Sequence, residues 1–289
     1  MSTYALPGSP DHSAQQAKPP VVVQASKGLL RLDLRPVWEY RELLYFLVWR
    51  DVKVRYKQTA IGAAWAICQP LLTMMIFAVI FGRFAKIPSD NVPYPIFAFA
   101  GLLPWTYFSQ SIARSGMSVV SDANLIRKIY FPRLIIPASA VVAPLVDFAL
   151  SLLILIVMMA WYRVTPNWAV ATLPLFICLA VCAALGVSLW LSALNVRYRD
   201  VGHAIPFLVQ FWMYASPIVY PVSLIPNQWR SLYSVNPMVA VVEGCRWGLL
   251  GKESPEFGAV VIGTLVALIL FLSGLIFFKR MERSFADIV

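Results

Sequence analysis

Residues 134–161 read LIIPASAVVAPLVDFALSLLILIVMMAW, and Asp147 is the one charged side chain among them. A run of about 20 apolar residues is long enough to cross the ~30 Å hydrocarbon core of a bilayer as a helix. Five more apolar segments follow this pattern. They occupy residues 61–81, 96–117, 168–194, 205–220 and 258–278, and the segment at 205–220 is the shortest. The sequence therefore predicts an all-α integral membrane protein with six transmembrane helices.

Lys and Arg residues are distributed unevenly over the connections between these segments. Of the 24 in the chain, 18 lie before the first segment, between the second and third, between the fourth and fifth, or after the sixth, with Arg114 near the end of the second segment counted in the connection that follows it, and 6 lie in the other connections. Cytoplasmic connections carry the excess of positive charge in membrane proteins, so we expect both termini in the cytoplasm. A further apolar run at residues 238–250 is too short to span, and it is expected to form a re-entrant or interfacial helix between helices five and six.

Composition excludes a soluble globular or a disordered protein, because 60% of the residues are hydrophobic, 13% are charged and the mean hydropathy is +0.70. The net charge of +10 follows from the basic cytoplasmic connections, so we expect no nucleic-acid partner. No apolar core followed by a cleavage site precedes the first segment, which predicts that no secretion signal is removed. Of the cysteines, only Cys245 is expected on the oxidising side, so a disulfide framework is not expected.

The chain divides into four parts by composition. Residues 1–35 are rich in Pro, Ser and Gln and are expected to form a disordered cytoplasmic tail. Residues 36–57 repeat apolar side chains at helical spacing opposite a polar side, which predicts an amphipathic helix in the cytoplasmic interface of the membrane. Residues 58–280 are expected to form the transmembrane domain, and residues 281–289 a cytoplasmic tail.

The usual motifs for phosphate hydrolysis, acyl transfer and metal catalysis are missing: the chain has no Gly-x-x-x-x-Gly-Lys-Ser/Thr loop, no Gly-x-Ser-x-Gly turn and no His-Glu-x-x-His pair. We therefore expect no catalytic residues, no metal ligands and no enzyme activity in this chain alone. Asp147 is the one carboxylate deep in a predicted span. It is either part of a proton relay, which normally uses several convergent membrane charges, or a structural hydrogen-bond acceptor.

Two short basic loops stand out on the predicted cytoplasmic side. Residues 121–133 are expected to form a helix of one or two turns, capped by Ser121 or Asp122 and ended by Pro132. Its apolar side chains, placed between charges, suit a groove on a soluble partner. Residues 195–200 form the second loop. Either loop could instead be a charged turn that anchors helix ends, and for the second loop this interpretation is equally good.

Several short runs resemble, in order and spacing, the ABC-2 type permeases that export lipid-linked polysaccharides. They are RYKQTAIG at 55–62 with Trp65 and QPL at 69–71, LPW at 103–105, NLI at 124–126 with YFPR at 130–133, Asn195 with YRD at 198–200, and SPIVY at 216–220. The resemblance covers about residues 37–280. It is greatest to the O-antigen exporters of Gram-negative bacteria, with teichoic acid exporters as near relatives.

This resemblance implies a homodimer that pairs with two copies of a separate cytoplasmic ATPase subunit, which would bind ATP and Mg. The permease itself would need no cofactor and would export a polyprenyl-linked polysaccharide as a multi-pass protein of the cell inner membrane. The resemblance also implies that the interface helix shapes the path of the cargo, and that the apolar run after Tyr220 forms gate helices on the outer face. The implied ATPase contacts are Asn124, Leu125, Ile126, Arg127, Lys128, Tyr130, Phe131 and Arg133.

Aromatic side chains recur at helical spacing in three of the predicted spans. In a pore, such rings can stack against the apolar faces of sugars while letting them slide, because stacking is weakly directional. Packing against lipid or within the core is the alternative for each set. The fifth span is favoured for the pore, because a short helix broken by Pro206 and Pro217 is tolerated where protein or water covers its backbone. The expected channel residues are Phe77, Phe81, Phe84, Trp105, Phe108, Phe207, Phe211 and Tyr214.

Other functions stay open at this point. An ABC-2 exporter could carry teichoic acid, capsule, lipid or drug, although a drug or small-lipid exporter would lack the KQT and QP runs at 57–59 and 69–70. A proton-coupled flippase acting alone would require Asp147. A membrane-embedded glycosyl- or acyltransferase would require a catalytic carboxylate or histidine at a membrane face.

Overall fold

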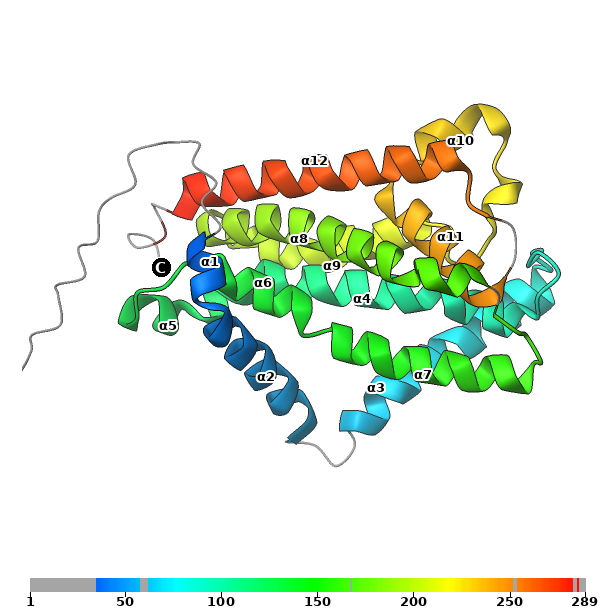
Figure 1. Cartoon of the computed structure of the whole chain (residues 1–289), viewed down its shortest axis with the longest axis horizontal. Helices are drawn as coiled ribbons and strands as arrows, with labels where there is room; N and C mark the ends of the chain where they lie inside the picture. The colour runs from blue at the N-terminus through cyan, green and yellow to red at the C-terminus, as the bar shows by residue number, and fades with distance from the viewer. Residues whose placement is uncertain (1–34, 58–61, 167, 252–253, 283–284, 286–289) are drawn as a thin grey trace, which may run out of the picture. The chain divides into compact units, whose positions relative to one another are not determined.

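The computed structural model describes residues 35–57, 62–166, 168–251, 254–282 and 285. Within these ranges every regular element is a helix and no strand occurs, as Figure 1 shows. The predicted all-α fold is therefore confirmed for the part of the chain that the structure describes. The predicted tails lie almost entirely outside the described residues.

Four stretches of the described chain are helical, long and apolar enough to cross a membrane by length and composition. The first, Ile67–Phe84, comprises the end of α3 (Gly62–Phe77) and the π-helix η1 (Ala78–Phe84). The second, Ile135–Trp161, comprises α6 (Ile135–Val142) and α7 (Leu145–Trp161). The third, Trp168–Arg197, comprises the 3₁₀-helix η2 (Trp168–Thr172) and α8 (Leu173–Arg197), and the fourth is α12 (Phe257–Glu282).

The other two predicted spans, one wholly and one partly helical, are not among these four. Residues 96–117 lie inside α4 (Tyr94–Ser121), which is packed among α3, α6, α7 and α8. Most side chains of α4 are buried in this chain, including those of Phe97, Phe99 and Phe108. Residues 205–220 overlap α9 (Asp200–Tyr214), which ends before Pro217. α4 is therefore the helix around which the core is built, and its apolar side chains pack mainly against protein.

Two glycines allow α8 and α12 to run side by side, as Figure 1 shows. A Cβ atom at Gly186 would lie 2.6 Å from the backbone of Leu270 and of Phe271. A Cβ atom at Gly274 of α12 would collide with the carbonyl oxygen of Gly186. Small residues permit such close backbone approach between helices in apolar surroundings, so this contact depends on the absence of side chains at both positions.

The helix predicted at residues 36–57 is divided into α1 (Arg35–Glu39) and α2 (Arg41–Lys57). α2 packs against α6 through Leu47, whose neighbours in a buried cluster are Phe131, Ile135 and Ile136. Large aromatic side chains of the two helices remain exposed. They are Trp38, Tyr45, Phe46 and Trp49.

The short helices gather at opposite ends of the long ones (Figure 1). α5 (Ala123–Lys128) lies at one end. η3 (Val222–Leu224), α10 (Asn227–Tyr233) and α11 (Pro237–Leu250) lie at the other. α11 corresponds to the apolar run at 238–250, and the Asn236 side chain caps it by accepting a hydrogen bond from the backbone nitrogen of Met238 at 3.0 Å.

Candidate functional site

A polar cavity of about 320 Å³ lies beside α3, α4 and α7. Hydrophilic side chains from four helices line it: Arg55 of α2, Gln69 and Thr73 of α3, Thr106, Gln110 and Arg114 of α4, and Asp147 and Ser151 of α7. Polar groups among membrane-spanning helices are costly unless they line a cavity or pair with one another. This cavity is therefore the candidate functional site.

Asp147, the carboxylate whose role the sequence left open, is paired within the chain. Its side chain forms an ion pair with Arg55, and the Tyr56 hydroxyl donates a hydrogen bond to it. Arg55 also donates from Nη2 to Oε1 of Gln110 at 3.0 Å. Asp147 is only 7% exposed, so these contacts compensate a carboxylate that would be costly to bury alone. The arrangement favours the structural acceptor over the proton relay.

The sequence did not predict the partners of Asp147, although Arg55 and Tyr56 begin the run RYKQTAIG at residues 55–62. They contact α7 because the end of α2 lies against the cavity. The spacing of residues along the chain does not show which helices lie side by side. Burial in the cavity wall lowers the pKa of the Arg55 guanidinium and raises the pKa of the Tyr56 phenol. Both shifts disfavour the charged form of the group, and the ion pair with Asp147 opposes this effect for Arg55.

A second ion pair joins α2 to the start of α5. The Arg50 guanidinium donates from Nη1 and Nη2 to the two oxygens of Asp122 at 3.1 and 2.9 Å. This contact raises the pKa of Arg50. Asp122 occupies the N-cap position of α5 but makes no capping bond with its side chain, and the Ser121 hydroxyl donates to the carbonyl oxygen of Ser118. The expected side-chain cap is therefore wrong, because the carboxylate that would have made it binds Arg50 instead.

The residues implied to contact an ATPase divide into an exposed set and an anchoring set. Asn124, Arg127, Lys128 and Tyr130 are exposed, and Leu125, Ile126, Phe131 and Arg133 are partly or fully buried. Phe131 packs with Leu47 of α2, and the Arg133 side chain donates to the carbonyl oxygen of Glu282 at 2.5 Å. Tyr130, in contrast, is 78% exposed. The exposed set is free to meet a partner, and the anchoring set holds α5 against α2 and the end of α12.

The expected channel aromatics are also placed differently from one another. Trp105 and Phe108 are 4% and 0% exposed and belong to the core of this chain, which is the packing alternative given above. Phe77 and Phe81 contact each other edge to face and are partly buried against the same core. The remaining four are exposed: Phe84, Phe207, Phe211 and Tyr214. The last three share one face of α9 at helical spacing, so α9 presents the largest exposed part of the expected set.

The second basic loop, at residues 195–200, contains one clear anchor. Asn195, at the end of α8, is 2% exposed, and its Nδ2 donates to the carbonyl oxygen of Gly116 in α4 at 3.0 Å. Tyr198 and Arg199, which follow it, are exposed. For Asn195 the structure thus supports the interpretation that this loop ties helix ends together. Among the residues that the structure describes, no three His, Cys, Asp or Glu side chains are grouped as metal ligands would be.

Comparisons with known proteins cover most of the chain. The family described as ABC-2 type transporter matches residues 42–250. An O-antigen export system permease protein, RfbA of Myxococcus xanthus, is 32% identical over 263 residues, which cover 90% of this chain and 99% of that protein. RfbA of Klebsiella pneumoniae is 30% identical over 249 residues, covering 86% and 95%. The polysialic acid transport protein KpsM of Escherichia coli is 27% identical over 242 residues, covering 81% and 92%.

Proposed function

The chain belongs to the ABC-2 type transporter family, and we propose that it is the permease subunit of an ATP-driven exporter that carries a lipid-linked polysaccharide across the cell inner membrane. The observation that carries the proposal is the polar cavity at Arg55, which is built into apolar helices of a permease family. The names of the relatives, which refer to O-antigen export and to polysialic acid transport, support a glycan as the cargo.

The proposed topology has six transmembrane helices, which adds α4 and α9 to the four candidate spans. α4, with 28 residues, has the required length, and α9, with 15, is short enough to need cover from protein or water. The basic connections support cytoplasmic termini. α5 then lies in the cytoplasm, and α10 and α11 form gate helices at the outer face. Residues 58–280 are the ABC-2 type transmembrane domain, residues 36–57 the interface helix, and residues 1–35 and 281–289 the cytoplasmic tails.

α5 is the proposed contact with the ATPase subunit, which binds ATP and Mg. The exposed side chains of Arg127 and Lys128 at its end, and of Tyr130 two residues beyond it, supply two positive charges and an aromatic ring for docking. Since Arg50 binds Asp122 at the start of α5, a displacement of α5 is transmitted directly to α2. In the proposed assembly two permease chains pair with two ATPase subunits, so that each nucleotide site acts on one α5.

The cavity at Arg55 is the proposed receptor for the hydrophilic head of the cargo. Arg55 and Arg114 bring guanidinium groups, which suit phosphate oxygens, and Gln69 and Gln110 bring amide groups. The exposed aromatic face of α9 then lines the channel that two copies of the chain enclose, where stacking on sugar rings favours sliding over tight binding. Phe84 and the partly buried pair Phe77 and Phe81 extend this lining on η1 and α3.

The proposal is tested by placing the permease in nanodiscs and in proteoliposomes, alone and with the nucleotide-binding protein that co-purifies with it. ATP hydrolysis by the complex but not by the permease, together with ATP-dependent movement of a polyprenyl-linked glycan, is the expected result. ATP-dependent movement of a fluorescent phospholipid or a drug in place of the glycan would reassign the cargo. Transport driven by a proton gradient, with no nucleotide-binding protein required, would overturn the exporter in favour of a stand-alone flippase.

A further inference from the structure

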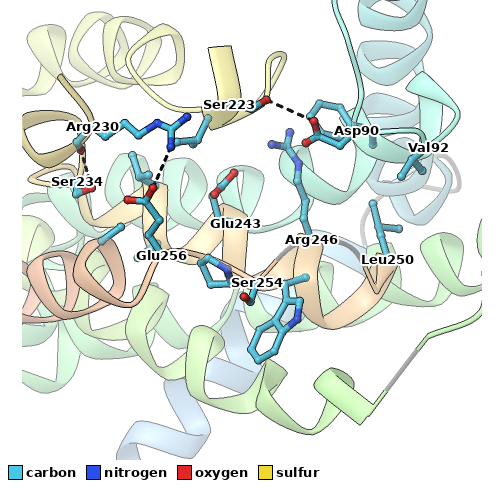
Figure 2. A pocket seen from close by; sticks show the side chains of 17 residues that line it. Asp90, Val92, Ser223, Arg230, Ser234, Glu243, Arg246, Leu250, Ser254 and Glu256 are labelled. Atoms are coloured by element: carbon cyan, nitrogen blue, oxygen red, sulfur yellow. Dashed lines mark hydrogen bonds and ion pairs between the residues drawn. The ribbon is translucent and has the colours of Figure 1, made fainter. Parts of the chain in front are cut away.

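A second pocket, of about 120 Å³, lies at the end of the helices opposite α5. Its walls come from α10, α11, the start of α12, and the connection between η1 and α4. In Figure 2 the side chains of Glu243 and Arg246 rise from the same side of α11 into this pocket, toward Asp90 and Ser223. The two residues are three positions apart on the helix, which places them on one face.

Arg246 is buried but is not satisfied. It is 6% exposed, its guanidinium lies 3.7 Å from the centre of the Phe97 ring, and its Nη2 donates to the carbonyl oxygen of Ile218 at 2.6 Å. Its Nε and Nη1 atoms have no hydrogen-bond partner in the described structure. A Cβ atom at Gly101 would lie 2.6 Å from Nη2, so the bare backbone there makes room for the guanidinium. Unpaired buried donors are costly, and Arg246 is one of the residues that line the pocket.

Hydrogen-bond acceptors line the same pocket. Glu243 forms no ion pair with Arg246 in the described structure, and burial raises the pKa of its carboxyl group, with Arg246 opposing the shift. Burial lowers the pKa of Arg246 to about 10, so the guanidinium still carries its charge near neutral pH. Asp90 accepts from the Ser223 hydroxyl at 3.4 Å, and Arg230 pairs with Glu256 at the rim at 2.9 Å. The pocket thus combines unpaired donors with carboxylate acceptors.

This combination selects one class of ligand chemistry. An anion would pair with Arg246 but would meet the carboxylates of Asp90, Glu243 and Glu256, and a cation would meet the two guanidinium groups. A hydroxyl group both donates and accepts, so a molecule with several hydroxyls satisfies both kinds of group at once. The rest of the lining is largely apolar and includes Trp247, whose ring packs edge to face on Trp168 at 5.5 Å. Such a wall suits the C–H face of a sugar ring.

We propose that this pocket is a saccharide subsite, in which Glu243 and Arg246 bind the hydroxyl groups of one neutral sugar residue of the glycan at the outer face of the permease. The assignment of the sugar to the cargo rests on the proposed function. A volume of about 120 Å³ holds several waters, since each needs roughly 10–15 Å³. The subsite therefore takes a single sugar ring and not a length of chain.

The test measures binding to the full-length permease in nanodiscs, without an ATPase, by saturation-transfer-difference NMR. The probes are the methyl glycosides of D-mannose, D-galactose and L-rhamnose, with inorganic phosphate and D-glucuronate as anions. At least one neutral glycoside is expected to bind saturably. Glu243→Gln should weaken it about tenfold, because a hydrogen bond to a charged carboxylate is replaced by one to a neutral amide. Glu42→Gln, at an exposed carboxylate of α2, should bind as the wild type does.

Three results would overturn the proposal: binding of phosphate or glucuronate in place of the glycosides, no binding of any probe beyond that of empty nanodiscs, or equal binding by Glu243→Gln and wild type. If Glu243→Gln does not fold, Trp247→Leu replaces it and should weaken binding by removing the stacking face. The exporter itself is judged separately, from ATP-dependent glycan movement. If no sugar binds but ATP-dependent export occurs, only the saccharide subsite is refuted. If a sugar binds but ATP-dependent export does not occur, only the exporter function is refuted.

Discussion

The Asp147 carboxylate of α7 is paired with the Arg55 guanidinium of α2, so the helix that precedes the first candidate span is held by a charge in the second. Asp147→Asn should therefore act on stability. It leaves Arg55, whose side chain is 22% exposed, without its counter-charge, at a cost of roughly 2 kcal/mol after allowance for solvent screening. Thermal unfolding of the variant in nanodiscs measures this loss.

The same variant separates a structural carboxylate from a proton relay. Export by the protein that remains folded should continue and should be insensitive to a protonophore, because ATP hydrolysis supplies the driving force. Glu42→Gln, at an exposed carboxylate, serves as the control for an unrelated loss of charge. Abolished export with unchanged stability, together with inhibition of the wild type by the protonophore, would restore the relay.

The bidentate contact between Arg50 and Asp122 predicts a defect in coupling. Arg50→Met keeps the aliphatic stem but removes the link between α2 and the start of α5. Because both side chains are partly exposed, about 1 kcal/mol of stability is at stake and the fold should persist. The glycan exported per ATP hydrolysed should fall, with hydrolysis itself maintained. Lys53→Met, an exposed position of the same helix, should leave this ratio unchanged.

Tyr130 and Phe131 are neighbours in sequence with opposite expected phenotypes. Tyr130→Ala and Arg127→Glu should weaken association with the ATPase while the unfolding temperature stays near that of the wild type, because both side chains are exposed. Phe131→Ala should instead lower stability by about 3 kcal/mol, since it empties a site that is 5% exposed. Co-purification with the ATPase and thermal unfolding distinguish the two effects. Normal association and export in both surface variants would exclude α5 as the docking element.

The apolar runs predicted the positions of the long helices well, because their length and composition are properties of single segments. α3 with η1, α6 with α7, η2 with α8, and α12 all fall on predicted segments. The sequence did not show that α4 is covered mainly by protein, since a residue such as Phe108 is equally apolar whether it faces lipid, a pore or the core. The Phe108 ring contacts the Trp212 ring of α9, which places Phe108 in the core. This contact joins helices that are far apart in the chain.

Polar contacts were harder to predict than apolar helices. Asp147 was recognised as unusual, but its partner Arg55 lies on a helix outside the spans, and periodicity identifies a face without identifying its neighbour. In the sequence Arg246 is only one of the six basic residues of the less basic connections, although Gly101 and Phe97 enclose its guanidinium in the structure. Burial of a charged group depends on the packing of several helices, so the local sequence does not predict it.

The backbone contact between α8 and α12 depends on Gly186 and Gly274. Gly186→Ala would place a methyl group 2.6 Å from the backbone of Leu270 and Phe271, which cannot move aside as the end of a flexible side chain could. The helices must separate, at a cost of about 1–3 kcal/mol, and Gly274→Ala should act in the same way from the other side. The unfolding temperature in nanodiscs and the yield of monodisperse protein are the measurements.

Gly258→Ala is the matched control, because a Cβ atom there meets nothing within 4 Å. In a helix, alanine is favoured over glycine by about 1 kcal/mol, so this variant should be as stable as the wild type or slightly more stable. The contrast separates close approach from helix propensity, since all three substitutions are the same chemical change. If Gly186→Ala and Gly274→Ala were as stable as Gly258→Ala, the backbones of α8 and α12 would have to lie further apart in the membrane than the close approach described here.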